Sequence, residues 1–389
     1  MIHNSRNLRI GVDARVLMPD TYGGVGEYTY QLLEAMARHA SSHTFCLFVN
    51  SSRELAGDFW RLLPPNCRLY RRRIPNKALT LAQRTVRRPL CDRLVGGVDV
   101  WWSPHFLPAP VSSSCPKVLT VHDLSFLYYP QMFDRKRRLW HWMVRGRREA
   151  QEADSIIAVS ESTAKDLTEK WGIPKERIKV VYSGVSRACK PITDKGTLVR
   201  VQKKYNLPPR FVLFLGVVEP RKNLEGLVRA YEHMRTRNPS QNIALVIAGI
   251  LGWSYRSLFE IIRVSPYRDD IHVLGFVDGQ DKPTLYSLAK LFVYPSFFEG
   301  FGFPPLEAMA CGTPTMVSHT TSLPELVGDA AVLIDPLRLE EVARAMEEVL
   351  QDVQLRQHLR NIGFERVKKF QWEDTARETL KILENSVRN

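Results

Sequence analysis

The sequence predicts an α/β protein with two domains, each built on a parallel sheet. Short apolar runs typical of buried strands alternate with helical patterns from one end of the chain to the other. At 389 residues, the chain suits two domains of ordinary size better than one. A polar stretch, Cys189–Thr197, separates two series of strands and helices. We therefore expect a first domain over residues 1–190 and a second over residues 200–370.

In the first domain, strands are expected at residues 8–13, 43–49, 98–102, 118–122, 155–159 and 178–182. Between the first strand and a helix predicted over residues 27–39 lies the glycine-rich loop Tyr22–Gly26, which includes Gly24. Glycines at such a turn often leave the backbone open to a phosphate or a sugar, although a plain tight turn explains them equally well. The loop does not match G-x-G-x-x-G, so a dinucleotide site is not supported.

His122 and Asp123 stand at the carboxyl end of the strand predicted over residues 118–122. Ligands of open α/β sheets bind at the carboxyl ends of parallel strands. His122 is therefore a candidate ligand contact, and the alternative is a structural histidine bonded to a nearby backbone carbonyl.

In the second domain, strands are expected at residues 211–216, 243–248, 271–274, 291–294 and 315–318. Arg221 and Lys222 follow the first of these strands and precede a helix. Two adjacent cations at the start of a helix suit a pyrophosphate, because the helix dipole adds to their charge.

The stretch from Glu299 to Glu307 is the most informative part of the chain. It contains the loop Gly300-Phe301-Gly302, then Pro304 and Pro305, which suit the start of a helix, then Leu306. Glycine lets a ligand approach the backbone, and a helix N-terminus attracts phosphate. We expect Glu299 in the loop and Glu307 in the first helical turn. A first-turn glutamate is also common without any function, because it complements the helix dipole.

Composition and charge narrow the possible functions. The net charge is +14, and residues 1–188 carry 29 Lys/Arg against 17 Asp/Glu. Ten cations and one acid, Asp92, fall within residues 61–93, and residues 135–148 hold a second basic cluster with interleaved tryptophans. This excess indicates a phosphate-rich or membrane partner for the first domain, the alternative being a solvated charged surface. We see neither an apolar run of membrane-spanning length nor a signal peptide, and six scattered cysteines without metal-ligand spacing indicate a reducing compartment.

Glu299 and Glu307 form an E-x7-E pattern, and this segment resembles the motif of retaining glycosyltransferases of family 4, which have the GT-B fold. The resemblance extends over essentially the whole chain. It implies two Rossmann-like parallel-sheet domains facing a central cleft. It also implies that the last helix, residues 371–389, crosses back to the first domain, with Trp372 as its anchor.

The resemblance also implies roles for individual residues. Glu307 would hold the ribose hydroxyls and Glu299 the donor-sugar hydroxyls, while Arg221 and Lys222 face the diphosphate. His122, with Glu299, would belong to the catalytic site. The remaining donor contacts implied by the resemblance are Gly24, Gly300, Phe301, Gly302 and Leu306. Many family members have an arginine directly after the glycine that ends the preceding strand, whereas this chain has Val217, and Arg221 is the candidate replacement.

The function that this resemblance implies is transfer of a hexose from a nucleoside diphosphate sugar to a hydroxyl acceptor. The segment Glu219–Asn223 is similar to that of bacterial mannosyltransferases of lipid-linked polysaccharide assembly. This similarity favours GDP-mannose as donor. The basic first domain fits an acceptor carried on a lipid diphosphate, such as a lipid-linked glycan, at the cytoplasmic face of a membrane. We expect no metal, because the chain has no D-x-D motif and two protein cations can neutralise the leaving diphosphate.

Two alternative functions stay open. A nucleotide-sugar 2-epimerase shares this architecture and would convert the donor without an added acceptor. A nucleic-acid-binding protein would explain the positive charge, but the basic runs show no aromatic stacking pattern at strand spacing and no recognition module.

Overall fold

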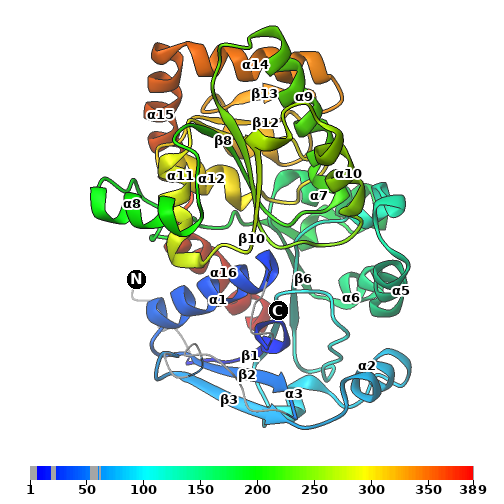
Figure 1. Cartoon of the computed structure of the whole chain (residues 1–389). Helices are drawn as coiled ribbons and strands as arrows, with labels where there is room; N and C mark the ends of the chain where they lie inside the picture. Colours follow the sequence, from blue (N-terminus) through cyan, green and yellow to red (C-terminus); the bar gives the residue numbers. More distant parts are fainter. Residues whose placement is uncertain (1–6, 19–22, 53–59, 61–62, 389) are drawn as a thin grey trace. The chain divides into compact units, whose positions relative to one another are not determined.

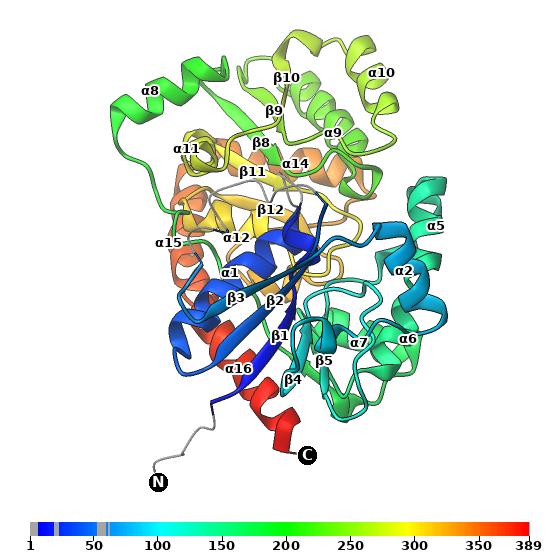
Figure 2. The same ribbon diagram turned by 90° about the horizontal axis from the view of Figure 1, so that it is seen from below.

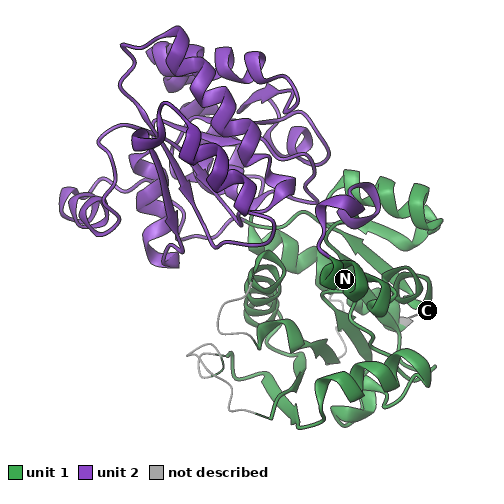
Figure 3. Ribbon diagram, turned by 45° about the vertical axis from the view of Figure 1, so that its right-hand side comes forward, with its two compact units in different colours: residues 1–124, 135–184, 371–389 green, residues 125–134, 185–370 purple. Residues whose placement is uncertain are grey.

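The computed structural model of the protein describes residues 7–18, 23–52, 60 and 63–388. The chain forms two compact units, shown in green and purple in Figure 3. The first unit comprises Met1–Leu124, Arg135–Gly184 and Gln371–Asn389, and the second comprises Ser125–Asp134 and Val185–Phe370. Ser125–Asp134, which lies inside the range predicted for the first domain, thus clusters with the second unit.

The first unit contains a seven-stranded sheet with the order β3-β2-β1-β4-β5-β6-β7. Its strands are β1 (Arg9–Asp13), β2 (Thr44–Asn50), β3 (Cys67–Arg72), β4 (Val100–Ser103), β5 (Lys117–Val121), β6 (Ser155–Ala158) and β7 (Ile178–Val180). Each pairs in parallel with its neighbours; Ile10 of β1, for example, lies opposite Phe45 of β2 and Val100 of β4. The central strands are buried because helices cover both faces of a parallel sheet.

The second unit contains a six-stranded parallel sheet with the order β10-β9-β8-β11-β12-β13. Its strands are β8 (Phe211–Leu215), β9 (Ala244–Ala248), β10 (Ile271–Gly275), β11 (Leu291–Tyr294), β12 (Thr315–Ser318) and β13 (Val332–Ile334). All residues of β8 and β9 are buried. Burying one large apolar side chain stabilises a fold by about 1.5–3 kcal/mol, so these strands anchor the loops at their ends.

The predicted α/β fold with two parallel sheets is confirmed, and each predicted strand is present with similar bounds. Two strands were not predicted, β3 and β13, and both lie at sheet edges. β3 has the sequence CRLYRR and is only partly buried, so it lacks the apolar run that indicates a buried strand. Its arginines donate to backbone carbonyls, Arg71 to Ser51 at 3.0 Å and Arg72 to Leu94.

Helices cover both faces of the first sheet. On one face α1 (Gly24–His39) packs against α16 (Trp372–Arg388), and α6 (Gly146–Glu152) and α7 (Glu161–Trp171) lie on the opposite face (Figure 2). The other helices of this unit are α2 (Asn76–Thr85), α3 (Cys91–Leu94) and α5 (Arg135–Val144). The basic segment 135–148 thus falls on two helices, which are separated at Arg145, whose φ is 51°.

The helix at the end of the chain is fixed to the first unit by Trp372. The ring of Trp372 lies 5.9 Å from that of Tyr28 on α1. A Cβ at Gly184 would lie only 2.3 Å from the backbone nitrogen of Trp372, so this close approach requires glycine at position 184. Among the helices that the structure describes, none has the length and apolar character needed to cross a membrane.

Helices also cover both faces of the second sheet (Figure 1). On one face lie α9 (Leu224–Arg237), α10 (Arg256–Val264) and α14 (Leu339–Gln351). On the other lie α11 (Lys282–Leu288), α12 (Phe303–Ala310) and α15 (Val353–Val367). The remaining α-helices are α4 (Ser125–Tyr128), α8 (Lys195–Lys204) and α13 (Leu323–Val327).

Each sheet has a point where its strand order reverses direction. In the first unit this point lies between β1 and β4, and in the second it lies between β8 and β11. The loops that leave two neighbouring strands there turn to opposite faces of the sheet and open a crevice at the carboxyl ends. In the first unit, the predicted site residues Gly24 and His122 come after β1 and β5. In the second unit, the predicted site residues come after β8 and β11.

Candidate active site

The turn after β8 positions Arg221 and Lys222. Both belong to a short 3-10 helix, Pro220–Lys222, which follows Glu219 and precedes α9. Asn223 joins the two helices in a left-handed conformation with φ 54°, which asparagine tolerates better than most residues. Its side-chain amide donates to the carbonyl of Pro336 at 2.8 Å. The backbone conformation of Asn223 and its side-chain hydrogen bond therefore fix the turn between β8 and α9.

The loop after β11 positions Glu299, and residues after β12 hold this loop. The backbone N–H of Glu299 donates to the Thr321 hydroxyl at 3.0 Å. The Ser322 hydroxyl lies 2.9 Å from the carbonyl oxygen of Glu299 and 2.5 Å from that of Phe301. Thr321 and Ser322 were not identified from the sequence, because nothing in their local pattern distinguishes them from ordinary loop residues.

The two loops meet in a cluster of two cations and two carboxylates. Lys222 Nζ donates to Glu299 Oε1 at 2.5 Å and to the Tyr294 hydroxyl at 2.7 Å. Arg221 Nη1 donates to Glu299 Oε2 at 3.0 Å, and its Nη2 donates to Glu219 Oε1 at 2.6 Å. Glu299 thus binds one cation with each oxygen, and the four charged groups sum to zero.

Burial and charge set the protonation of this cluster. Lys222 is 5% exposed and Glu299 is 7% exposed. Burial alone would raise the pKa of Glu299, but the charges of Arg221 and Lys222 outweigh it and lower that pKa to about 2. Burial, together with the neighbouring charge of Arg221, lowers the pKa of Lys222. Glu299 is therefore fully ionised at neutral pH.

This pairing adds a constraint that the sequence did not reveal. Sequence reasoning assigned the cations to a diphosphate and Glu299 to a sugar, whereas in this structure they bind each other. An incoming diphosphate must therefore share or replace the carboxylates as partners of the cations. The donor-site roles of these three residues stay predictions.

Helix α12 begins at Phe303, and Gly302 precedes it with φ 127°. A Cβ at Gly302 would lie 2.8 Å from Leu323 Cδ2, so both its backbone conformation and its surroundings require glycine. Pro304 and Pro305 are the second and third helical residues, and they remove two of the N–H groups that a helix start normally offers to an anion. Glu307 is the fifth helical residue, so the prediction that it lies in the first turn was wrong, because the helix begins at Phe303, one residue before the first proline.

Glu307 is half-buried, and its Oε2 accepts a hydrogen bond from the Tyr286 hydroxyl at 2.9 Å. Tyr286 is fully buried on α11 and was not identified from the sequence. Two other predicted donor contacts, Phe301 and Leu306, have buried side chains. The ring of Phe301 packs 5.0 Å from that of Phe303, so Phe301 and Leu306 can offer a ligand only their backbone.

The glycine loop of the first unit is shorter than predicted. Helix α1 begins at Gly24, not at residue 27, and Tyr22 lies outside the described residues. A Cβ at Gly23 or Gly24 would meet nothing within 4 Å, and neither has a positive φ. The fold therefore does not require glycine at either position, and the backbone of Gly24 stays open to approach.

His122 follows β5, and its ring is fixed from two sides. Its Nε2 lies 2.8 Å from the carbonyl oxygen of Pro104. Because a carbonyl only accepts, Nε2 carries the proton and Nδ1 of the neutral ring is an acceptor. The ring of Tyr28 on α1 stands edge-on at 4.7 Å. Burial lowers the pKa of His122, so the neutral form prevails at neutral pH.

A second polar group lies at the ends of β1 and β4 and was missed from the sequence. Asp13 ends β1, is fully buried, and forms an ion pair with Arg15 at 2.6 Å. His105 follows β4 and is 7% exposed. Its Nδ1 accepts from the N–H of Leu107 at 3.0 Å, so its proton lies on Nε2, 3.7 Å from Asp13 Oδ1. An aspartate at the carboxyl end of a predicted strand was the signal that could have identified this group.

The predicted site residues thus form two groups. In the second unit the structure brings Arg221, Lys222 and Glu299 into direct contact, and Glu307 follows on the adjoining helix. In the first unit His122 contacts Tyr28, which lies on the same helix as Gly24.

Comparison with known proteins agrees with this division. The family model described as "Glycosyltransferase Family 4" matches residues 22–188, and the model described as "Glycosyl transferases group 1" matches residues 198–366. The O-antigen chain mannosyltransferase B of Escherichia coli is 30% identical over 378 residues, which cover 92% of this chain and 94% of the relative. The serotype-specific mannosyltransferase WbdA of E. coli is 33% identical over 264 residues, 67% of this chain and 32% of that protein.

A solved structure shows the same fold at lower identity. The sucrose-phosphate synthase of Thermosynechococcus elongatus has a TM-score of 0.76 and 22% identity, with 97% of this chain and 98% of that chain covered. The fold is therefore GT-B, and the relatives give no support to the epimerase alternative. Both halves of the chain match glycosyltransferase models and nearly all of it matches one mannosyltransferase, so the protein is a glycosyltransferase that belongs to glycosyltransferase family 4.

Proposed function

We propose that the protein transfers mannose from GDP-mannose to a hydroxyl group of a lipid-linked glycan, with retention of anomeric configuration. The names of the two relatives support mannose as the sugar. The segment Glu219–Asn223 supports GDP-mannose as the donor through its similarity to bacterial mannosyltransferases.

One observation carries the proposal, the cluster formed by Arg221, Lys222 and Glu299. When the bond between sugar and diphosphate breaks, negative charge accumulates on the leaving diphosphate. Cations that are already in place stabilise this charge without reorganisation, and removing one such group typically costs about 100- to 1,000-fold in rate. The ion pairs with Glu299 hold both cations at one point before the donor arrives.

The same cations support a reaction without a metal. Lys222 and Arg221 supply the positive charge that a divalent ion supplies in other nucleotide-sugar enzymes. We expect full transferase activity in an excess of chelator. Loss of activity with chelator, restored by a divalent ion, would overturn this part of the proposal.

His122 contributes an acceptor to the proposed reaction. The carbonyl of Pro104 fixes the proton on Nε2 and leaves Nδ1 as an acceptor. We assign Nδ1 to a hydroxyl group of the donor sugar. His122→Ala should therefore lower kcat/KM for transfer, whereas binding of GDP alone, which carries no sugar, should change little.

The first unit supports an anionic membrane surface as the place of reaction. Residues 135–138 at the start of α5 are all cationic and exposed, and Trp140 and Trp142 on the same helix are exposed as well. Tryptophan favours the membrane interface, and each cation near an anionic leaflet contributes about 1 kcal/mol. The proposed location is the cytoplasmic face of the membrane.

The structure changes which residues should be tested for membrane association. The basic stretch of residues 61–93 includes Arg71, Arg72 and Arg73. Arg71 and Arg72 donate to backbone carbonyls beside the edge strand β3, whereas Arg73 is exposed. Arg61, the first cation of this stretch, lies outside the described residues. Replacing Lys136 and Arg138 with glutamine should reduce sedimentation with anionic vesicles and leave GDP binding unchanged. Undiminished sedimentation would reject the membrane surface.

The donor and the reaction class are tested together. A thermal-shift screen of GDP, UDP and ADP should show the largest stabilisation with GDP. Incubation with GDP-mannose and a membrane-derived acceptor should then give a glycosidic bond with the donor's anomeric configuration by NMR. A larger shift with another nucleotide, or conversion of GDP-mannose to an epimer without acceptor, would contradict the proposal.

A further inference from the structure

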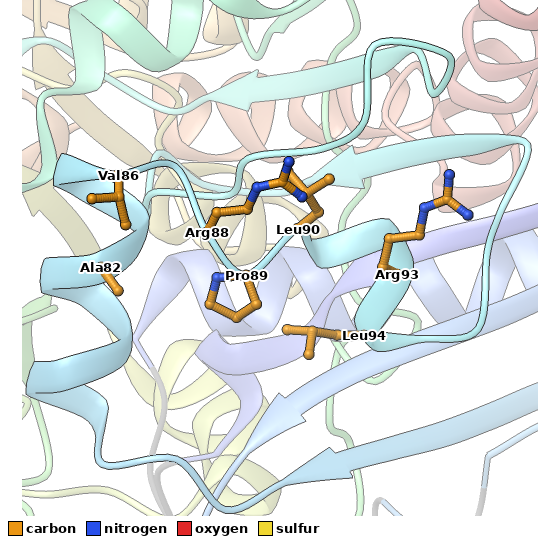
Figure 4. Close-up of a pocket in the computed structure, with 7 residues that line it drawn as sticks. All are labelled: Ala82, Val86, Arg88, Pro89, Leu90, Arg93 and Leu94. Atoms are coloured by element: carbon orange, nitrogen blue, oxygen red, sulfur yellow. The ribbon is translucent and has the colours of Figure 1, made fainter.

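We propose that a pocket in the first unit binds the phosphate-proximal part of the acceptor's lipid chain, and this inference rests on the proposed function. The pocket has a volume of about 540 Å³ and lies between the end of α2 and helix α3. Ligand pockets typically span about 300–1,000 Å³. Its lining consists of Ala82, Val86, Arg88, Pro89, Leu90, Arg93 and Leu94 (Figure 4).

The lining combines an apolar wall with two cations. Five of the seven residues are apolar, and Val86 on the α2 wall is 67% exposed. Figure 4 shows the guanidinium groups of Arg88 and Arg93 extending to the same side of the pocket. A simple phosphate would not need the apolar wall, and a neutral hydrocarbon would not need two arginines. The chemistry that fits both is an amphiphile with an anionic head group.

Arg88 and Arg93 are available to such a head group. Arg88 is exposed and makes no hydrogen bond or ion pair with any residue that the structure describes. Arg93 lies 3.6 Å from Asp92 and is 70% exposed. Asp92 itself is buried and binds the backbone N–H and the hydroxyl of Ser112. The neighbouring Arg87, by contrast, forms an ion pair with Glu149 at 2.7 Å and is therefore not available to a ligand.

The walls of the pocket are fixed before any ligand arrives. Gln83 on α2 is fully buried. Its amide nitrogen donates to the carbonyl of Pro89 and to Cys91 Sγ, both at 3.2 Å, so it ties α2 to the segment that leads into α3. Its carbonyl oxygen accepts from Arg15 at 3.1 Å, and Arg15 binds Asp13 at the end of β1. Hydrogen bonds through Gln83 and Arg15 thus connect Pro89 in the pocket lining to Asp13 at the end of β1.

The adjoining surface suits a chain that emerges from a lipid leaflet. Arg84 on α2 stacks over the ring of Trp142 on α5 at 4.1 Å, which joins the pocket helix to the basic and aromatic surface of α5. Trp142 is 63% exposed. The surface beside α2 thus offers cations and an exposed aromatic ring, which suit a lipid interface.

The test measures binding of dodecyl phosphate to the full chain by isothermal titration calorimetry, below the micelle concentration. Dodecanol and inorganic phosphate serve as separate arms. We expect saturable 1:1 binding of dodecyl phosphate and at least tenfold weaker binding of either fragment. Equal affinity for inorganic phosphate would overturn the proposal, because the apolar wall would then contribute nothing.

Matched variants locate the binding. Arg88→Glu and Val86→Asp should each weaken dodecyl phosphate binding by about tenfold or more, which corresponds to one lost charge-assisted contact or one lost apolar wall. Lys77→Glu and Leu81→Asp make the same chemical changes at exposed positions of α2 outside the pocket, and they should change binding less than twofold. Equal effects of the two pairs would overturn the proposal, since the response would then reflect net charge and not the pocket.

Two further measurements distinguish binding at this pocket from binding at the donor site and from membrane association. Lys222→Ala should bind dodecyl phosphate like the parent chain; loss of binding there would place the probe at the donor site and overturn the pocket. Val86→Asp should sediment with anionic vesicles within twofold of the parent; loss of sedimentation with unchanged dodecyl phosphate binding would overturn it as well. Failure of the proposed function would appear separately, as absence of mannosyl transfer by the parent chain.

Discussion

The two units place chemically different groups at the carboxyl ends of their strands. In the second unit, Arg221, Lys222 and Glu299 are all charged, and their ion pairs are 2.5 to 3.0 Å long. In the first unit, His105 is buried and His122 is half-buried, both rings are neutral, and backbone groups fix their tautomers. The same topology thus carries an ionic cluster in one unit and neutral hydrogen-bonding rings in the other.

This difference indicates what each unit is suited to contact. An ionic cluster suits a group whose charge changes during reaction, such as a leaving diphosphate. Neutral rings with fixed donors and acceptors suit hydroxyl groups, which are recognised by direction and not by charge. The predictions that follow test this contrast.

The largest expected effect is loss of catalysis in Lys222→Ala. Removing one of two cations beside the leaving group should lower kcat by about 100- to 1,000-fold, measured as initial rate of sugar transfer. Lys290→Ala is the control, because it removes an exposed lysine from the same unit and should leave kcat unchanged. Normal turnover in Lys222→Ala, with its circular dichroism spectrum intact, would break the contrast between the two units.

The second prediction concerns the neutral state of His105. Burial lowers the pKa of His105 from 6.5 to about 4, so as pH falls the unfolded chain takes up this proton before the native chain does. This contribution to stability is complete above about pH 6.5 and is lost as pH falls towards 4. It amounts to about 3 kcal/mol. Urea unfolding between pH 7 and pH 4 should therefore show a flatter pH dependence in His105→Asn than in the parent. Parallel curves would show that His105 is not held neutral by the fold.

The third prediction is a loss of donor affinity in Glu307→Ala. The carboxylate is held by Tyr286 on one oxygen and accepts no other described hydrogen bond, which suits a ribose hydroxyl. The dissociation constant for GDP should rise about tenfold. Tyr286→Phe, which removes only the orienting hydroxyl, should have a smaller effect in the same direction. Unchanged affinity in Glu307→Ala would remove it from the donor site.

The smallest predicted effect has the opposite sign. Glu299→Gln keeps the shape of the side chain but removes the charge that neutralises Arg221 and Lys222. A diphosphate then has no carboxylate to displace, so GDP should bind more tightly, by about threefold to tenfold, while transfer slows. Calorimetry with GDP measures the first effect, and weaker binding in Glu299→Gln would show that the carboxylate does not compete with the diphosphate.

Sequence reasoning predicted the fold well because the central strands are apolar and buried on both faces. The exceptions were β3 and β13 at the sheet edges, where the strands are not buried enough to show an apolar run. Helix starts were also shifted: α1 begins at Gly24, inside what had been predicted as a loop. Glycine is a poor local signal of where a helix begins, because packing in the folded chain determines the first helical residue.

The sequence identified only those site residues that come shortly after a predicted strand. Arg221, Lys222, Glu299 and His122 stand just after strands, and that position identified them. Their partners could not be found, because Tyr294, Tyr286 and Thr321 become neighbours only through the sheet order. The mutual pairing of the cations with Glu299 likewise requires β8 and β11 to be adjacent, which one sequence cannot establish.

The most direct test of the central claim compares GDP with GMP in the parent chain and in Lys222→Ala. If Lys222 receives the diphosphate, the parent should bind GDP at least tenfold more tightly than GMP, and calorimetry should show that gap nearly closed in Lys222→Ala. A gap of the same size in both proteins would contradict the account, because the second phosphate would then be bound elsewhere.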